Sequence, residues 1–271
     1  MKQVSYITMM AIALCVQFTV SAQDDSTKSK TQFKLGLYYN SHLHYYGRTD
    51  SLRSSGVFPM AELWFNENVY INAAPVFVNN AQRRFQYAGT IATAGYMFND
   101  HKRWAGNFYL VKPFYQSNTQ LVQSALKAQA VGTLTLQTKI LNITGGGDIK
   151  LSDKLDYGAT TALDHIFRFE LPGKSILVLD PTATMNAGTQ QFTNTYFKKS
   201  DFLFFPGPDQ LVSEQVKKFN VLSYEVSMPV IFAKGKLQLL AIPAYVIPQN
   251  LTGNERGENL FYATLGAKVI F

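Results

Sequence analysis

The chain has 271 residues and a formal net charge of +7 at pH 7, from 25 Lys and Arg against 18 Asp and Glu. The basic residues are dispersed and form no concentrated run, which argues against a nucleic-acid-binding surface. The only cysteine is Cys15, so a disulfide within the chain is excluded.

Residues 1–22 have the pattern of a cleaved export signal. Lys2 supplies a positive start, Tyr6 to Val20 is largely apolar, and Val20-Ser21-Ala22 fits a small-residue cleavage site before Gln23. The apolar run is shorter than the roughly 20 residues of a membrane-spanning helix, so a retained anchor is the less favoured alternative. Cys15 does not fit a lipoprotein signal, because Leu14 stands where that signal has a small residue. Cleavage would also remove Cys15 and with it any cysteine nucleophile or thiolate metal ligand.

The rest of the chain predicts one domain. Residues 23–31 are polar and are predicted to form a short periplasmic leader, and residues 32–271 are predicted to form the domain itself. The mean hydropathy of −0.06 is low for a helical membrane protein. Instead, alternating segments of about ten residues are followed by turns, which is the signature of a transmembrane β-barrel.

The first predicted strand covers residues 33–46. Phe33, Leu35 and Leu37 lie on one face, while Lys34, Asn40, His42 and His44 lie on the other and are expected to point into a polar lumen. Four more strands are predicted over residues 57–65, 69–78, 85–98 and 104–115. Polar segments between them, such as Asn66-Glu67-Asn68, are typical of hairpin turns.

Residues 116–140 are less clear. Residues 116–124 read as a polar loop, and residues 121–130 fit either a short amphipathic helix or the start of a strand that continues to Gln137. The strand interpretation is favoured and places Lys127 on the inner face. Strands over 141–151 and 155–169 then share a charged face that carries Asp148, Lys150, Asp156, Asp164 and Arg168. Gly145-Gly146-Gly147 has no helix after it and is interpreted as a bend or crowded spot, not as a phosphate loop.

The last third of the chain predicts four strands. Residues 177–190 place Asp180 inward, and residues 217–232 do the same for Glu225. The longest break, 197–215, is predicted to be a surface loop with its own aromatic cluster. Residues 237–246 are apolar on nearly both faces, and Pro243 is awkward for a central strand. In the final strand, 259–271, Lys268 is expected to face inward, and the outward face carries Phe261, Leu265, Val269 and Phe271.

Twelve strands result, and an even number places both ends of the domain in the periplasm. Short turns alternate with mostly longer loops, and the last strand is expected to close the sheet against the first. A soluble sandwich or lipocalin-like barrel would place polar residues outward and would have to pack 20 Phe and 15 Tyr around one core. The predicted fold is therefore all-β: a closed antiparallel up-and-down transmembrane β-barrel.

The chain resembles outer-membrane β-barrel proteins of Gram-negative bacteria, especially small barrels of the Bacteroidota type. The resemblance rests on the Val20-Ser21-Ala22-Gln23 leader end, on aromatics placed like membrane-interface girdles, and on the Phe261 to Phe271 terminus. It implies a location in the outer membrane, contact with outer-membrane lipid and lipopolysaccharide, and handling by the barrel-insertion machinery, for which Phe271 would be a sorting signal. It identifies no subfamily and implies no active site.

Function is predicted from the inward set. A small pore or solute-binding barrel with a mixed-charge lumen is the leading hypothesis, and a closed structural or partner-binding barrel is the alternative. The residues predicted to line the lumen are Lys34, Asn40, His42, His44, Lys127, Asp148, Lys150, Asp156, Asp164, Arg168, Asp180, Glu225 and Lys268.

An enzyme or a metal site is less well supported. His42 and His44 are two possible metal ligands without a third. Ser41 lies beside them, which leaves an outer-membrane hydrolase of the lipase or protease type as a second alternative, but no nucleophile and base are specified. Asp164 and His165 are adjacent on a strand and so are expected to point to opposite faces. No catalytic residue and no cofactor are assigned.

Overall fold

The computed structural model describes residues 31–49, 52–82, 84–100, 103–115, 126–152, 155–198, 201–202, 205–206, 210–251 and 257–271, with side chains described outside 191–217. The predicted export signal and all of the predicted leader except Thr31 lie outside these residues. Within them the regular structure consists of strands. No helix in the described part is long and apolar enough to cross a membrane.

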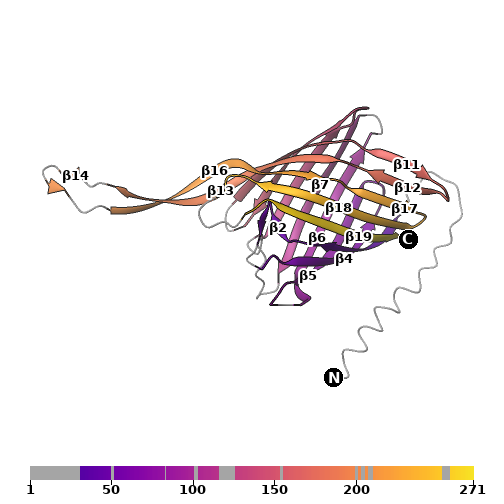
Figure 1. Cartoon of the computed structure of the whole chain (residues 1–271), viewed down its shortest axis with the longest axis horizontal. Coiled ribbons are helices and arrows are strands. Elements are labelled where there is room, and N and C mark those ends of the chain that lie inside the picture. The colour runs from indigo at the N-terminus through magenta and orange to yellow at the C-terminus, as the bar shows by residue number, and fades with distance from the viewer. Residues whose placement is uncertain are drawn as a thin grey trace, which may run out of the picture.

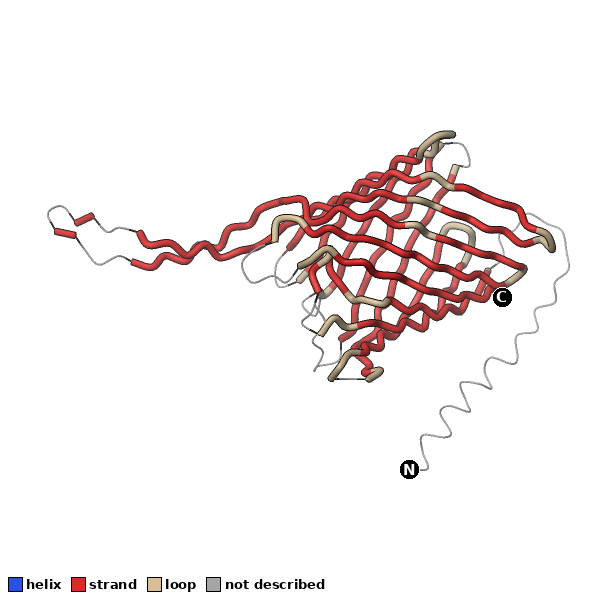
Figure 2. The backbone as a smooth tube through the Cα atoms, viewed as in Figure 1, coloured by secondary structure: helices blue, strands red, loops and turns tan. Residues whose placement is uncertain are grey.

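Twelve antiparallel strands form the barrel, and three of them are interrupted once (Figures 1 and 2). In chain order they are β1 (Gln32–Asn40), β4 (Ser55–Trp64), β5 (Val69–Asn79), β6 (Gln86–Asn99), β7 (Trp104–Tyr115), β8 (Ala128–Leu136), β9 (Asn142–Leu151), β10 with β11 (Leu155–Asp164 and Phe167–Leu171), β12 with β13 (Ser175–Leu179 and Thr182–Lys198), β16 with β17 (Gln210–Ser227 and Val230–Lys234), β18 (Leu237–Pro248) and β19 (Leu260–Ile270).

The barrel is closed by its last strand. β19 pairs with β18 along one edge and with β1 along the other, where Leu37 lies opposite Ala267. The Phe271 amide donates a hydrogen bond of 2.8 Å to the Phe33 carbonyl, and the two rings lie 6.1 Å apart. Closure satisfies the backbone groups that a sheet edge would expose to lipid. The predicted closed antiparallel barrel is confirmed.

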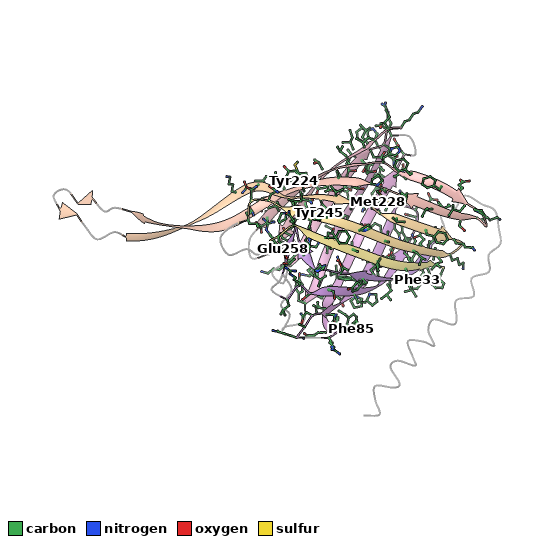
Figure 3. All side chains as sticks on the ribbon, viewed as in Figure 1. Phe33, Phe85, Tyr224, Met228, Tyr245 and Glu258 are labelled. Atoms are coloured by element: carbon green, nitrogen blue, oxygen red, sulfur yellow. The ribbon has the colours of Figure 1, made fainter. Side chains whose placement is uncertain are left out.

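Side chains alternate between the two faces of the barrel wall. On β1, Phe33, Leu35 and Leu37 are exposed, whereas Lys34 and Tyr38 are half-buried. The same alternation follows the register around the sheet, and Figure 3 shows side chains on both sides of the wall. The outward positions are mainly Leu, Ile, Val, Phe and Tyr, as a surface in contact with lipid requires.

Inward aromatic rings lie over glycines of their own strand or of a neighbouring strand. A Cβ atom on Gly266 would come within 2.6 Å of the Tyr38 ring, and one on Gly36 within 2.7 Å of it. The Tyr70 ring covers Gly95 in the same way. The missing Cβ atoms let these rings lie flat along the wall.

A row of prolines crosses three adjacent strands where two of them are interrupted. The carbonyl of Pro229 accepts a bond of 2.9 Å from the Asp180 amide, and that of Pro243 accepts one of 3.0 Å from Met228. The carbonyl of Pro181 accepts a longer bond of 3.4 Å from His165. None of the three prolines can donate a backbone hydrogen bond to the neighbouring strand, because proline has no N–H. Pro243 nevertheless lies inside β18, a central strand.

The longest predicted break is wrong in extent. β13 and β16 pair as far as Lys198 and Gln210, so much of the segment predicted as a loop over 197–215 is a two-stranded ribbon. The ribbon extends beyond the barrel toward the short pair β14 (Asp201–Phe202) and β15 (Phe205–Pro206), on the left of Figure 1. Outside the membrane neither face of a ribbon has to be apolar, so the alternation on which the prediction relied is absent there.

The first strand is shorter than predicted. β1 ends at Asn40, and the following residues form a loop that contains β2 (His44–Tyr45) and β3 (Arg48–Thr49). His42 and His44 therefore lie in a loop. The helix considered over 121–130 falls partly outside the described residues, and β8 begins at Ala128.

Candidate functional site

The loop between β1 and β4, described over residues 41–49 and 52–54 and called here the mouth loop, folds across one end of the lumen. The His44 ring packs edge-on against Tyr262 of β19 at 4.3 Å. Tyr45 and Tyr46 each place their rings 6.0 Å from the Lys150 Nζ atom of β9. β9 is the seventh strand and lies half-way around the barrel from β1. The mouth loop thus contacts opposite sides of the wall.

Arg48 anchors the mouth loop to β16 and to the end of β18, the neighbour of β19. The residue is 7% exposed, and its guanidinium donates bonds of 3.2 Å to the Leu222 carbonyl and 3.1 Å to the Gln249 carbonyl. Its backbone forms an isolated bridge with Gly257. Hydrogen bonds from a charged group to carbonyls are among the stronger polar contacts in proteins, so the loop is fastened to the wall.

Two titratable groups of the mouth loop show how enclosed it is. Burial raises the pKa of Tyr46 to about 12, with Asp148 contributing. Burial, with a smaller contribution from the neighbouring His42, lowers the pKa of His44 to about 4. The Gly47 amide donates to His44 Nδ1 at 3.2 Å, which places the proton of the neutral ring on Nε2.

Below the mouth loop the lumen holds a cavity of about 420 Å³. Asn72 and Asn107 supply amides, and Tyr70 donates a hydrogen bond of 3.2 Å to Asn107. No Lys, Arg, Asp or Glu lines this cavity among the described residues. Its lining residues are Tyr38, Phe58, Met60, Tyr70, Asn72, Ala74, Ile91, Thr93, Asn107, Tyr109 and Thr264.

A charged cluster lies on the same side of the lumen, at the end of the barrel opposite the mouth loop. The Lys34 ammonium stacks over the Trp64 ring at 4.0 Å, and the Trp64 indole donates a bond of 3.0 Å to Glu62. Lys268 pairs with Glu62 at 3.6 Å. The cluster joins β1, β4 and β19, and its two lysines share the one carboxylate of Glu62.

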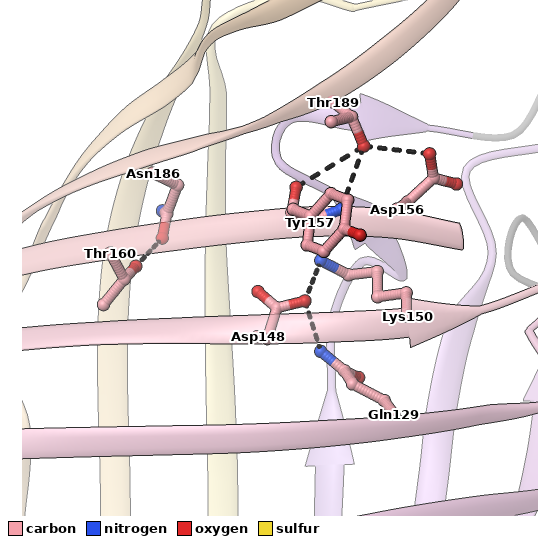
Figure 4. Close-up of polar contacts among 8 residues, drawn as sticks. All are labelled: Gln129, Asp148, Lys150, Asp156, Tyr157, Thr160, Asn186 and Thr189. Atoms are coloured by element: carbon pink, nitrogen blue, oxygen red, sulfur yellow. Dashed lines mark hydrogen bonds and ion pairs between the residues drawn. The ribbon is translucent and has the colours of Figure 1, made fainter.

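The opposite wall is polar. Figure 4 shows Asp148 of β9 paired with Lys150 on the same strand and accepting a bond of 3.1 Å from Gln129. Thr189 donates to Asp156 at 2.9 Å. Asn186 accepts a hydrogen bond from Thr160 and donates one of 3.2 Å to Ser223. The lumen therefore has one side of aromatic, apolar and amide groups, charged at the end opposite the mouth loop, and one side of hydroxyl, amide and charged groups.

The structure separates the predicted lumen residues into groups. His42 and His44 lie in the mouth loop, and Lys127 precedes β8. Register places ten on inward positions of the strands or, for Asp180, between β12 and β13: Lys34, Asn40, Asp148, Lys150, Asp156, Asp164, Arg168, Asp180, Glu225 and Lys268.

The residues named for a hydrolase or a metal site have the following contacts. Ser41 Oγ lies 3.2 Å from His42 Nδ1 and accepts a bond of 2.9 Å from the Ala263 amide. Among the described residues no carboxylate is bonded to His42, and no group of three or more His, Cys, Asp and Glu side chains is arranged to hold a metal ion. Asp164 bonds Asn142 at 2.8 Å, whereas the His165 ring packs on Phe167.

The sequence did not identify the mouth-loop residues that reach furthest. Alternation continues from β1 into His44, so the pattern predicts Tyr45 and Tyr46 at a strand end and Arg48 in a polar loop. The one residue in the sequence that indicates a turn at this point is Gly47, whose φ in the structure is positive, at 78°.

No protein-family model and no curated protein sequence matches this chain. Solved structures match at low similarity. An outer membrane channel from Pseudomonas putida F1 shares 12% identity with a TM-score of 0.44, covering 93% of this chain and 100% of that one. LpxR from Salmonella typhimurium shares 10% identity with a TM-score of 0.38, covering 88% and 100%. OmpT of Vibrio cholerae shares 8% identity with a TM-score of 0.29, covering 92% and 99%. The fold assignment rests on the strands of this chain itself.

Proposed function

We propose that this protein is a small-solute pore of the outer membrane of a Gram-negative bacterium, narrowed at its outer end by the mouth loop. The observation that carries the proposal is the uncharged cavity of about 420 Å³ inside the barrel, directly below that loop. A cavity of this size is within the usual range for small-molecule sites.

The cavity also suggests the kind of solute. Its tyrosines and asparagines offer hydrogen bonds, and Phe58, Met60 and Ile91 offer an apolar surface. A charged solute would have to give up water there without gaining a counter-charge. The favoured solute is therefore uncharged, with hydroxyl groups and an apolar face.

Planar-bilayer conductance of the refolded protein tests the pore. The wild type should carry a small current, and the double variant Tyr45→Ala/Tyr46→Ala should carry a larger one because it removes the two rings that cross the mouth. Tyr39→Ala/Tyr245→Ala is the matched control, since both of these tyrosines are exposed on the outward face, and its current should equal that of the wild type.

Absence of current above background in the wild type and in the mouth-loop variant, across many insertions, would overturn the pore. That result would favour the alternative of a closed structural or partner-binding barrel. Swelling of liposomes in glucose compared with gluconate tests the solute class, because the two differ mainly in charge. Faster entry of gluconate would contradict the uncharged solute.

A further inference from the structure

Lys112 lies on the outward face of the barrel wall, away from the turns. Lys112 of β7 pairs with Ala92 of β6 in a row of outward residues, and its side chain is exposed. Among the outward strand positions whose side chains are described, the only other Lys, Arg, Asp or Glu is Lys234, the last residue of β17 beside a turn. A charge facing hydrocarbon is costly unless it reaches the interface or a counter-charge.

Lys112 borders a groove on that same face. The groove has a volume of about 820 Å³, and its lining includes Lys112, Leu110 and Ile149. The groove exists because the side chains at its floor are small. Ala61, Ala73 and Ala92 follow one another in register across β4, β5 and β6, up to Lys112. Adjacent strands are about 4.8 Å apart, so the floor from β4 to β8 is roughly 19 Å long.

The depth of Lys112 indicates which leaflet it meets. It lies three residues before Tyr115, where β7 ends on the side of the mouth loop. This is roughly 10 Å along the strand. A lysine stem can lie along the apolar groove while its ammonium reaches the headgroup level. On the proposed orientation that level is the outer leaflet, whose main lipid is phosphorylated.

A second copy of the chain is a poorer occupant. The outward positions of the described strands carry no carboxylate, so a neighbouring barrel packed here would cover Lys112 without a counter-charge. A phosphorylated lipid supplies both parts that the groove lacks, an acyl chain and an anion.

We propose that this groove binds the lipid A part of lipopolysaccharide, with an acyl chain along the alanine floor and a phosphate at the Lys112 ammonium. The inference rests on the outer-membrane location in the proposed function and is independent of conductance.

Native mass spectrometry of the full-length mature barrel in mild detergent tests the site, with lipid A, phosphatidylglycerol and phosphatidylethanolamine as probes. Lys112→Gln should lower lipid A occupancy about fivefold, which is the usual contribution of one cation near an anionic headgroup. Ala92→Leu, which fills the groove and keeps the charge, should lower it as well. Lys234→Gln is the charge-matched control and should bind as the wild type does.

Equal lipid A occupancy in Lys112→Gln and the wild type would overturn the proposal. So would equal wild-type binding of lipid A and phosphatidylethanolamine, and so would stronger binding of phosphatidylglycerol than of lipid A. Dimers that Ala92→Leu dissociates would assign the groove to a second copy instead. Heat-modifiable gel mobility verifies that each variant is folded. Bilayer conductance is measured in parallel, so a failure of the pore would be seen separately from a failure of the lipid site.

Discussion

Gly158 of β10 lies beside the Asp148–Lys150 ion pair of the polar wall. It faces inward opposite Asp148, and a Cβ atom there would collide with the Asp148 carboxylate. The Lys150 ammonium lies 3.0 Å from the same point. The absent side chain at Gly158 therefore makes the room in which the Asp148–Lys150 ion pair forms.

We predict that Gly158→Ala displaces Asp148 and lowers the free energy of unfolding by about 1–3 kcal/mol, the usual cost of leaving a buried polar group without its partner. Denaturant titration of the barrel in detergent measures this. Gly145→Ala is the matched control, because nothing lies within 4 Å of a Cβ atom there. Equal destabilisation by both substitutions would show that loss of strand glycine itself, and not the ion pair, is responsible.

At the scale of elements, the mouth loop is held by contacts of different kinds. Arg48 fastens it with hydrogen bonds, whereas His44 contributes a neutral ring packed on Tyr262. The titratable groups in contact with or beside His44 are Tyr262 and His42. No described carboxylate is bonded to the His44 ring. Protonation of His44 would therefore place an uncompensated charge inside the packed loop.

The His44 pKa gives the loop a pH dependence of definite sign. The pKa is about 4 in the packed loop and 6.5 in water, so a released loop binds the proton more tightly. Loop packing is fully stable above pH 6.5 and weakens as pH falls toward 4, by up to about 3 kcal/mol. Conductance should therefore rise on acidification from pH 7 to pH 5. His44→Phe keeps a ring against Tyr262 and should flatten this response; an unchanged profile would assign the titration to other groups.

The sequence predicted the strands of the barrel well and the loops poorly. Membrane-spanning strands such as β7 alternate because lipid and lumen impose opposite demands on successive residues. Nothing imposes that pattern on the mouth loop or on the ribbon of β13 and β16, so their structure could not be read from alternation. The inward direction of Lys34 followed from the pattern, whereas the contacts of Tyr45 with the far wall depend on closure of the whole sheet.

At the scale of the whole molecule, closure depends on β19. Each of its edges is paired, and Phe271 adds the final contact with Phe33. Deletion of Phe271 should reduce the fraction of protein that assembles in the outer membrane, with little effect on the conductance of molecules that do assemble. The readout is the heat-modifiable fraction on gels, since a closed barrel migrates differently before and after boiling.

Phe108→Ala, which removes an exposed outward ring from β7, serves as control and should assemble normally. Equal yield without Phe271 would contradict our proposal that this residue is a signal for the barrel-insertion machinery. Export by a cleaved signal over residues 1–22 and the Bacteroidota affiliation stay predictions.

The row of Pro181, Pro229 and Pro243 has a mechanical consequence. Each proline removes one cross-strand bond at the same height, so three adjacent strands share a line along which fewer bonds resist shear. Under a pulling force applied at the C-terminus, the barrel should not unravel in twelve equal steps. The segments on either side of that line should yield separately, and a force-extension trace would record the three strands from β12 to β18 as pairs of shorter events.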